Sequence, residues 1–293
     1  MNQQLPGVLF GLAAFMSWGF LPAYWKQLNT VLPFEIICHR IVWSCVFLCL
    51  IISVQKRWGE VSQVAGNSNN LKKLFCSGLL IGFNWFIYIW AVNTNHVVET
   101  SLGYYITPMV NVLIGFLLLG ERFNRLQLLA IVFALAGVSY SLMAYGDLPF
   151  FALTLAFSFA FYGYARKKIM VAPIPGLLIE TSVLFLPALF FIVYRSVFCE
   201  SPFFRQPDVT LWLIGSGVAT SLPLLWFASA ARKLQLSTVG ILQYLAPSIA
   251  FGLGVFVYLE PFDWHTAVTF IFIWIGVVIY CTDSLRRSRQ RHC

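Results

Sequence analysis

Long apolar runs separated by short polar stretches make up most of the chain. Each run is about 20 residues long and lacks the two-residue alternation of a barrel strand. Because backbone groups in lipid must be satisfied within their own segment, each run predicts a membrane-spanning helix. The predicted spans cover residues 7–26, 34–54, 73–93, 97–119, 124–145, 148–167, 176–198, 210–231, 237–259 and 264–282.

The composition supports this all-α, polytopic membrane fold. Of 293 residues, 59% are hydrophobic and only 10% are charged, which leaves too little polar surface to solvate a globule. The seven cysteines show no disulfide framework or zinc spacing, and motifs for zinc peptidases and phosphate-binding loops are absent. We therefore expect no enzyme activity, no cofactor and no metal. The first run is too long for a signal peptide and is interpreted as a retained helix.

The formal charge of +8 follows from short basic clusters between the runs. With a cytoplasmic N-terminus, 15 of the 19 Lys and Arg residues face the cytoplasm, three face the other side, and Arg40 lies within a span. The positive-inside rule therefore predicts that both termini are cytoplasmic, and it explains the charge without nucleic acid. The 15 residues are Lys56, Arg57, Lys72, Lys73, Arg122, Arg125, Arg166, Lys167, Lys168, Arg232, Lys233, Arg286, Arg287, Arg289 and Arg291.

The chain also matches itself at an offset of 139 residues without gaps. The match predicts two five-span units, residues 1–145 and 146–293. Because five is an odd number, the second unit crosses the membrane in the opposite sense, an arrangement typical of secondary transporters and also found in channels. Matching pairs include Tyr105 and Tyr244, Pro108 and Pro247, Gly115 and Gly254, Glu121 and Glu260, and Gly137 and Gly276.

Several motifs resemble those of the drug/metabolite transporter superfamily and, within it, the EamA permeases. The resemblance covers nearly the whole chain and implies a ten-helix permease of a bacterial inner membrane that exports or exchanges small metabolites or drugs. The motifs that carry it include Trp18-Gly19-Phe20, Ala23-Tyr24-Trp25-Lys26, His39-Arg40, Asn84-Trp85, Gly120-Glu121-Arg122-Phe123, Tyr162-Gly163 and Arg166-Lys167-Lys168.

Charged residues within spans are rare and costly, so they are candidates for the site. Glu35 and His39 are four residues apart on one helical face and can pair, whereas Arg40 points elsewhere. One interpretation has Arg40 snorkelling outward and pairing locally. The other has the three residues lining a cavity, where Arg40 binds an anionic group or Glu35 and His39 relay a proton.

Glu180 in the seventh span takes the place that Glu35 holds in the first half. The two acids are either alternate proton sites or local partners of neighbouring helix ends. The local partners would be the Lys26 region for Glu35 and Arg166 or Lys167 for Glu180. Both interpretations stay open.

Uncharged polar and aromatic side chains complete the candidate set. In the fourth span, Ser101 can share a face with Tyr104 or Tyr105, although Tyr104 also suits an interfacial belt. Asn84 needs a hydrogen-bond partner and is expected to face the bundle.

Two acids at span ends are expected to be capping residues. They are Glu121 and Glu260, beside the expected helix caps Asn124 and Asp263. The remaining candidates are Trp85, Glu99, Gln243 and Tyr244.

These observations favour a secondary transporter that works by alternating access, with proton coupling through the buried acids as one option. The expected partners are the lipid bilayer and an amphipathic or aromatic metabolite, an amino acid or a drug. The chain would act as a monomer or homodimer. A channel and a non-transporting membrane scaffold are the alternatives.

Overall fold

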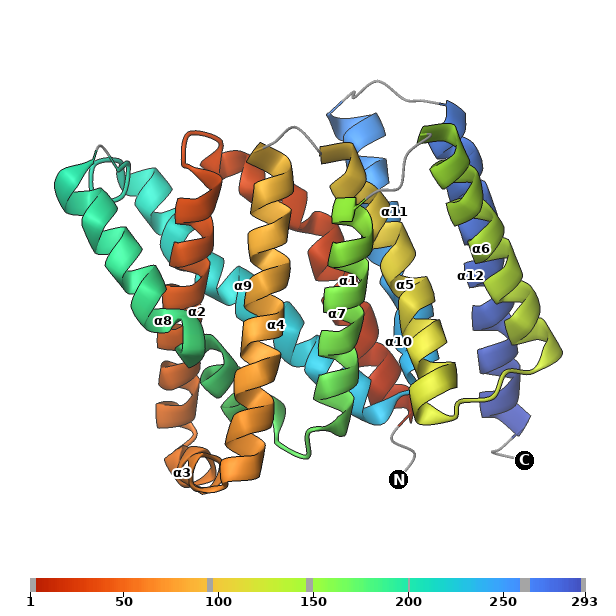
Figure 1. Ribbon diagram of the computed structural model, residues 1–293, viewed down its shortest axis with the longest axis horizontal. Helices are drawn as coiled ribbons and strands as arrows, with labels where there is room; N and C mark the ends of the chain where they lie inside the picture. The colour runs from red at the N-terminus through yellow and green to blue at the C-terminus, as the bar shows by residue number, and fades with distance from the viewer. Residues whose placement is uncertain (1–3, 94–96, 146–149, 200, 259–263, 291–293) are drawn as a thin grey trace.

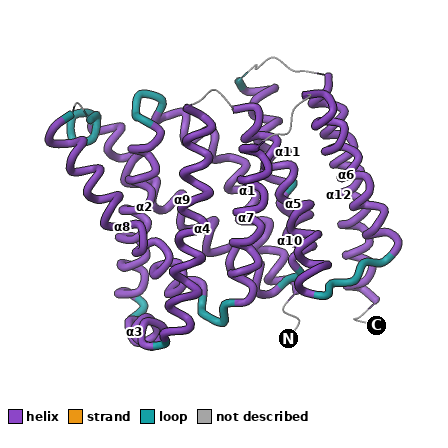
Figure 2. The backbone as a smooth tube through the Cα atoms, in the orientation of Figure 1, coloured by secondary structure: helices purple, strands orange, loops and turns teal. Residues whose placement is uncertain are grey.

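The computed structural model describes residues 4–93, 97–145, 150–199, 201–258 and 264–290, and every element in these ranges is helical. The elements and their arrangement are shown in Figure 1 and Figure 2. They are α1 (Gln4–Trp25), η1 (Lys26–Leu28), α2 (Pro33–Val54), α3 (Trp58–Gly66), α4 (Ser68–Asn93), α5 (Val97–Leu119), α6 (Arg125–Tyr145), α7 (Phe150–Lys168), α8 (Pro173–Phe198), α9 (Pro207–Lys233), α10 (Leu236–Gln243), α11 (Leu245–Gly252), the π-helix η2 (Leu253–Val257) and α12 (Trp264–Gln290).

Local signals fix where several helices begin and end. Pro33, Pro173 and Pro207 occupy the first helical position, where no backbone N–H is needed. At the start of α6, the side chains of Asn124 and Gln127 each accept a hydrogen bond from the other's backbone N–H, so the predicted cap is confirmed. Basic residues close the last turns of α7 and α9, where they complement the helix dipole.

The chain is a multi-pass membrane protein. Each predicted span overlaps a helix, and six helical segments of the described chain are long and apolar enough to cross a membrane. Two shorter apolar helices, Gly103–Leu119 and Ala267–Tyr280, accompany them. Large apolar side chains such as Met143, Phe190 and Val197 point outward, as expected for surfaces in contact with lipid.

Two local features differ from the sequence prediction. The ninth span was expected as one helix over 237–259, but it breaks at Tyr244 into α10 and α11 and ends in η2. Pro247 lacks the N–H that would bond to the carbonyl of Gln243, which favours the break.

The second difference is α3, a short helix between α2 and α4 that was not predicted and that buries no residue. Arg57 donates two hydrogen bonds of 2.6 Å to Glu60 at its start, and these bonds lower the pKa of the Glu60 carboxyl group. The helix is too short to span a membrane and lies at one end of the bundle (Figure 1).

The principal packing contacts join the first half of the chain to the second. The main helix pairs are α1 with α9 and α11, α2 with α8 and α9, α4 with α7 and α8, α5 with α7 and α10, and α6 with α12. Helices α1 and α9 are both inclined where they meet in the middle of the bundle, and α6 with α12 forms one flank (Figure 1). We call the end where α1 begins and α12 ends the basic end, because α7 and α9 also place their terminal lysines and arginines there.

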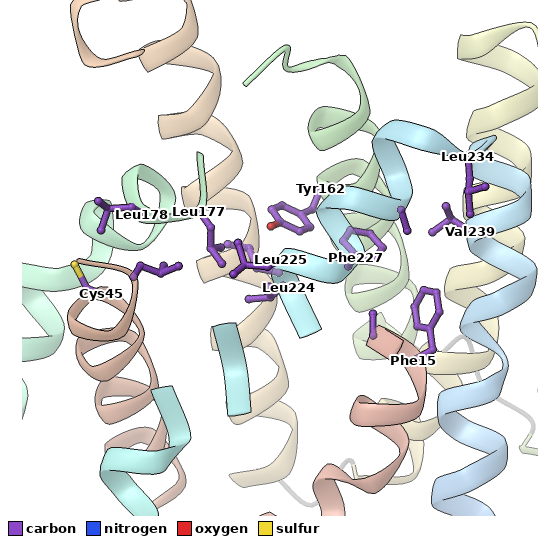
Figure 3. Packing of buried hydrophobic residues seen from close by; sticks show 14 of the residues in the cluster. Phe15, Cys45, Tyr162, Leu177, Leu178, Leu224, Leu225, Phe227, Leu234 and Val239 are labelled. Atoms are coloured by element: carbon purple, nitrogen blue, oxygen red, sulfur yellow. The ribbon is translucent and has the colours of Figure 1, made fainter. Parts of the chain in front are cut away.

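The largest apolar cluster of the described residues runs through the bundle from α2 and α8, across α9 and α7, to α1 and α10 (Figure 3). The rings of Tyr162 and Phe227 are stacked with centres 6.0 Å apart, and Phe15 meets Phe227 edge-on at 6.2 Å. Elsewhere the helices approach at glycines. A Cβ atom on Gly78 would lie 2.7 Å from the Glu180 carbonyl oxygen, and one on Gly217 would overlap the backbone of Trp43.

The contact of Gly217 with α2 predicts that Gly217→Ala destabilises the protein by about 1–3 kcal/mol, because α2 and α9 must move apart. Thermal unfolding of the purified protein in detergent measures the effect. Gly59→Ala on α3 is the matched control, since a Cβ there meets nothing within 4 Å, and its melting temperature should be unchanged or slightly higher. Equal melting temperatures for the two variants would contradict the close packing of α2 on α9.

Candidate functional site

Arg40 lies among aromatic rings roughly 10 Å along α2 from Pro33. The carbon of its guanidinium group is 4.9 Å from the centre of the Trp25 ring and 5.1 Å from that of Trp85. Both distances are within the range of cation–π attraction. Its Nε donates a hydrogen bond of 2.9 Å to Oγ1 of Thr220 on α9.

Two tyrosines extend this cluster. Tyr88 on α4 and Tyr104 on α5 lie near the Arg40 guanidinium group. The centres of their rings are 6.4 Å apart, and Tyr104 is 49% exposed. We call Arg40, Trp25, Trp85, Tyr88, Tyr104 and Thr220 the Arg40 cage.

The charge of Arg40 has no acidic partner among the described residues. The ion pairs within the spans join Arg166 to Glu180 and Arg195 to Glu35. No described residue accepts a hydrogen bond from the two terminal nitrogens of Arg40, whose Nε alone is bonded. A cation without an acidic partner at this depth is costly, which makes Arg40 a candidate functional residue.

Glu35 is fully buried near the start of α2 and contacts neither of the partners considered from the sequence. Its carboxylate accepts a hydrogen bond from Ser201 and one of 3.4 Å from Nε of Arg195 on α8. Glu35 therefore bonds to a neighbouring helix end, as one interpretation of the sequence held, but its partner is Arg195 in the last turn of α8 and not the Lys26 region or His39. Arg195 is 160 residues away from Glu35 in the sequence, so the spacing of residues could not predict this pair.

His39 is also fully buried but belongs to a different cluster. Its Nδ1 accepts a hydrogen bond of 3.2 Å from Nε1 of Trp43, and its ring lies 4.4 Å from that of Phe203. Its Nε2 has no hydrogen-bond partner among the described residues. The predicted relay from Glu35 to His39 therefore has no direct contact to support it.

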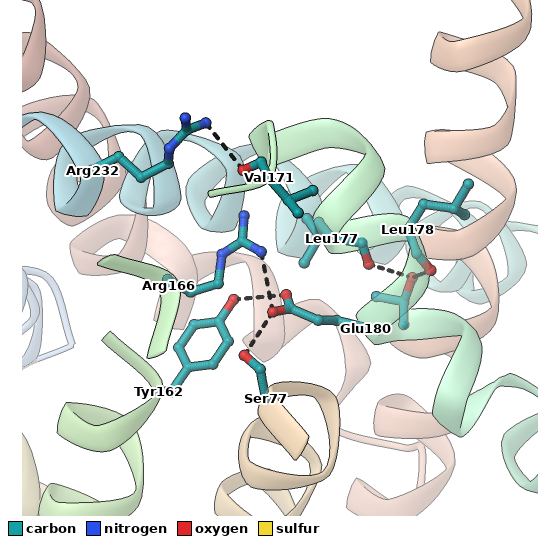
Figure 4. Close-up of polar contacts among 9 residues, drawn as sticks. Ser77, Tyr162, Arg166, Val171, Leu177, Leu178, Glu180 and Arg232 are labelled. Atoms are coloured by element: carbon teal, nitrogen blue, oxygen red, sulfur yellow. Dashed lines mark hydrogen bonds and ion pairs between the residues drawn. The ribbon is translucent and has the colours of Figure 1, made fainter. Parts of the chain in front are cut away.

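Glu180 forms a buried network at the basic end of α8 (Figure 4). Its carboxylate accepts hydrogen bonds of 2.7 Å from Ser77, 3.3 Å from Tyr162 and 3.2 Å from Nη1 of Arg166. The proposed bond to Arg166 is confirmed, and both charges are buried. Glu180 lies seven residues after Pro173, as Arg40 lies seven after Pro33, so its positional counterpart in the first half is Arg40 and not Glu35.

Asn84 and Tyr105 mainly hold helices together. Asn84 donates hydrogen bonds to the Leu155 carbonyl oxygen and to Ser158 on α7, so it faces the bundle as predicted. Tyr105 packs edge-on against Phe270 of α12 at 5.1 Å, away from the Arg40 cage.

Two of the four remaining candidates, Gln243 and Tyr244, lie where α10 packs against α5 and α12. Gln243 accepts a hydrogen bond of 2.9 Å from Asn111 on α5, and Tyr244 is buried against α6 and α12. Glu99 and Ser101 lie in α5, but their side chains are outside the described part of the structure, as are residues 260 and 263.

Glu121 caps a helix of the other half. Its carboxylate accepts hydrogen bonds from the backbone N–H groups of Leu236 and Ser237 and from the Ser237 hydroxyl, at 2.6–3.0 Å. A carboxylate at this position satisfies the first free N–H groups of α10 and complements its dipole. The predicted capping role is confirmed, although the capped helix is α10.

A groove of about 560 Å³ between α1 and α9 offers a different kind of surface. Its lining residues include Met16, Phe20, Leu222 and Trp226, and none of them is charged. Met16 and Phe20 are about half exposed, as expected for side chains that face lipid acyl chains. The groove therefore has the character of a lipid-facing surface, whereas the polar chemistry is in the Arg40 cage.

The described structure is a bundle of membrane helices that holds a cation among aromatic rings, an arrangement consistent with a membrane permease for small molecules. The chain belongs to the EamA-like transporter family, whose model matches residues 5–143 and again residues 149–282. The resemblance deduced from the motifs is thus confirmed.

Relatives of nearly the same length support the assignment. Protein RarD of Salmonella typhimurium is 42% identical over 294 residues, covering 99% of both chains. An uncharacterized transporter of Bacillus subtilis, YojE, is 41% identical over 97% of this chain and 96% of its own. A solved crystal structure shares the fold at a TM-score of 0.72 with 18% identity, covering 94% of this chain and 97% of that one.

The buried Glu180 network predicts a non-additive pattern of stability. Glu180→Gln and Arg166→Met should each lower the free energy of unfolding by about 3–5 kcal/mol, because each leaves a buried charge without its partner. The double variant should recover much of this loss. Denaturant titration in mixed micelles measures all three. Arg57→Gln, which breaks the exposed pair with Glu60, is the control and should have little effect. Strictly additive losses would contradict the coupling.

Proposed function

We propose that the protein is a secondary carrier of small solutes that works by alternating access, with its binding site in the Arg40 cage. In this proposal ten spans form two inverted five-helix units, residues 1–145 and 146–293. The cage carries the proposal because it combines both units: Trp25, Arg40, Trp85 and the tyrosines come from the first, and Thr220 comes from the second.

Three observations support the inverted repeat. Helix α4 begins at residue 68, and α9 begins 139 residues later, at residue 207. The family model matches each half separately. When each helix is replaced by its counterpart in the other half, one packed pair maps onto another. The pair α1 with α9 maps onto α7 with α4, and α2 with α9 maps onto α8 with α4. Two similar bundles related in this way can interchange conformations around one site.

The buried ion pairs are suited to act as two gates. Glu35 with Arg195 and Ser201 joins α2 to α8 and the residues after it, at the end opposite the basic end. Glu180 with Arg166 and Ser77 joins α8 to α7 and α4 nearer the basic end. Because closed contacts exist on both sides of the cage, a carrier fits better than an open channel. In the proposed cycle one set of contacts opens while the other stays closed.

The basic end is proposed to face the cytoplasm of a bacterial cell, since cytoplasmic loops of membrane proteins carry the excess of Lys and Arg. Both chain termini then lie on that side. The amphipathic helix α3 would lie at the same surface, where Lys56 and Arg57, the two residues before it, can meet anionic lipid headgroups.

Cysteine labelling tests alternating access. With the native cysteines replaced, Tyr104→Cys should react with a membrane-impermeant maleimide from one side of the membrane at a time. Glu180→Gln should raise its reactivity from the basic-end side, and Glu35→Gln should raise it from the other side, because each variant weakens one gate.

Gly59→Cys on α3 is the control for this experiment, and its reactivity from the basic-end side should be the same in every background. Simultaneous labelling of Tyr104→Cys from both sides, or unitary currents in planar bilayers, would instead indicate a channel.

Proton coupling is tested separately by flux into proteoliposomes at two pH gradients, over a set of aromatic metabolites, amino acids and amphenicols. If the buried acids carry the proton, Glu180→Gln or Glu35→Gln abolishes the dependence of flux on the gradient, whereas His39→Gln does not, since His39 contacts neither acid. Unchanged dependence in both acid variants would exclude coupling through these residues.

A further inference from the structure

We propose that the Arg40 cage binds the carboxylate of an organic anion that also carries a flat aromatic group. This inference rests on the proposed carrier function and specifies its class of substrate. It follows from the free hydrogen-bonding capacity of Arg40, from the rings around it, and from the absence of a described acid beside it.

The guanidinium group of Arg40 is positioned to bind a planar anion. Its Nε is held by Thr220 and its position is fixed by Trp25 and Trp85, while its two terminal nitrogens carry no hydrogen bond to a described residue. The terminal nitrogens present a fork that matches the two oxygens of a carboxylate. Tyr88 and Tyr104 lie near Arg40, and their hydroxyl groups can serve as further donors to a bound anion.

The walls of the cage favour an aromatic solute over an aliphatic one. Trp25 and Trp85 lie on the guanidinium group, and Tyr88 faces Tyr104 with ring centres 6.4 Å apart. A flat ring attached to the bound carboxylate can pack edge-on or offset against these side chains. Tyr104 is half exposed, so its ring has surface available for such a contact.

The charge pattern also selects against zwitterionic amino acids. Their ammonium group would lie close to the charge of Arg40, and no described acid is there to offset the repulsion. Among the described residues, the glutamates buried within the surrounding spans are already paired, Glu35 with Arg195 and Glu180 with Arg166. An anion without an ammonium group therefore matches the single free positive charge of the cage.

Isothermal titration calorimetry on the purified full-length protein tests the inference with four probes. Phenylacetate should bind. Phenylacetamide, which has nearly the same shape without the charge, should bind at least about tenfold more weakly, as should phenylalanine. Cyclohexylacetate, which keeps the carboxylate but lacks the aromatic ring, should bind more weakly than phenylacetate.

Matched variants locate the binding. Arg40→Gln should weaken phenylacetate binding by about ten- to a hundredfold, and Arg40→Lys should weaken it less, since Lys keeps the charge without the fork. Trp85→Leu should lower affinity for phenylacetate more than for cyclohexylacetate. Arg57→Gln and Trp58→Leu on α3 remove the same residue types outside the cage and should leave affinity unchanged.

A melting curve without ligand separates a binding role from a structural one. Removing an unpaired cation from a span should leave the melting temperature of Arg40→Gln equal to or above that of the wild type, whereas loss of a structural arginine would lower it.

A lower melting temperature of Arg40→Gln, or equal binding of phenylacetate and phenylacetamide, would overturn the inference. So would tighter binding of phenylalanine. These results would leave the carrier proposal intact if Tyr104→Cys still reacts from one side at a time.

Discussion

The structure depends on one constraint: inside an apolar bundle, a polar group must find its partner on another helix. Water is absent at this depth, so an unsatisfied hydrogen-bonding group or charge costs several kcal/mol. Asn84 meets this requirement through α7, Ser77 through Glu180 of α8, and Glu121 through the start of α10. Arg40 meets it only in part, with a single hydrogen bond and two aromatic faces. Other buried groups, among them His39 Nε2 and two nitrogens of Arg166, also lack a hydrogen-bond partner among the described residues, but Arg166 is paired with Glu180. Arg40 differs because no described acid balances its charge.

The same constraint makes the two halves inseparable. Helix packing runs chiefly between the halves, and it is closest at glycines in corresponding places: Gly78 meets α8 as Gly217 meets α2, and Gly137 meets α12 as Gly276 meets α6. Small residues let helix backbones approach, and van der Waals packing replaces the hydrophobic effect, which gives little driving force between helices in lipid. A change of conformation therefore cannot separate one half from the other as a rigid body. It must tilt helix pairs against each other at the glycine contacts.

The sequence predicted the helices well and their polar partners poorly, for physical reasons. An apolar run long enough to cross a membrane can only be a helix, so α2, α5 and α9 begin within about three residues of their predicted positions. Partners such as Glu35 with Arg195 are 160 residues apart, and no local spacing encodes them. The break at Tyr244 was also missed, because Pro247 has a counterpart in Pro108, around which α5 stays continuous.

For the site, Arg40, Trp85 and Tyr104 were predicted individually. Trp25, Tyr88 and Thr220 were not, since an aromatic or hydroxyl residue in a span is equally consistent with a lipid or packing position.

The cap that Glu121 provides for α10 bears on how the protein is made. When the first five spans have left the ribosome, the residues that this carboxylate will hold, Leu236 and Ser237, have not yet been synthesised. The same is true of the hydrogen-bond partners of Asn84, Ser77 and Arg40, which all lie beyond residue 150. These hydrogen bonds can therefore form only after the second half has been synthesised and inserted.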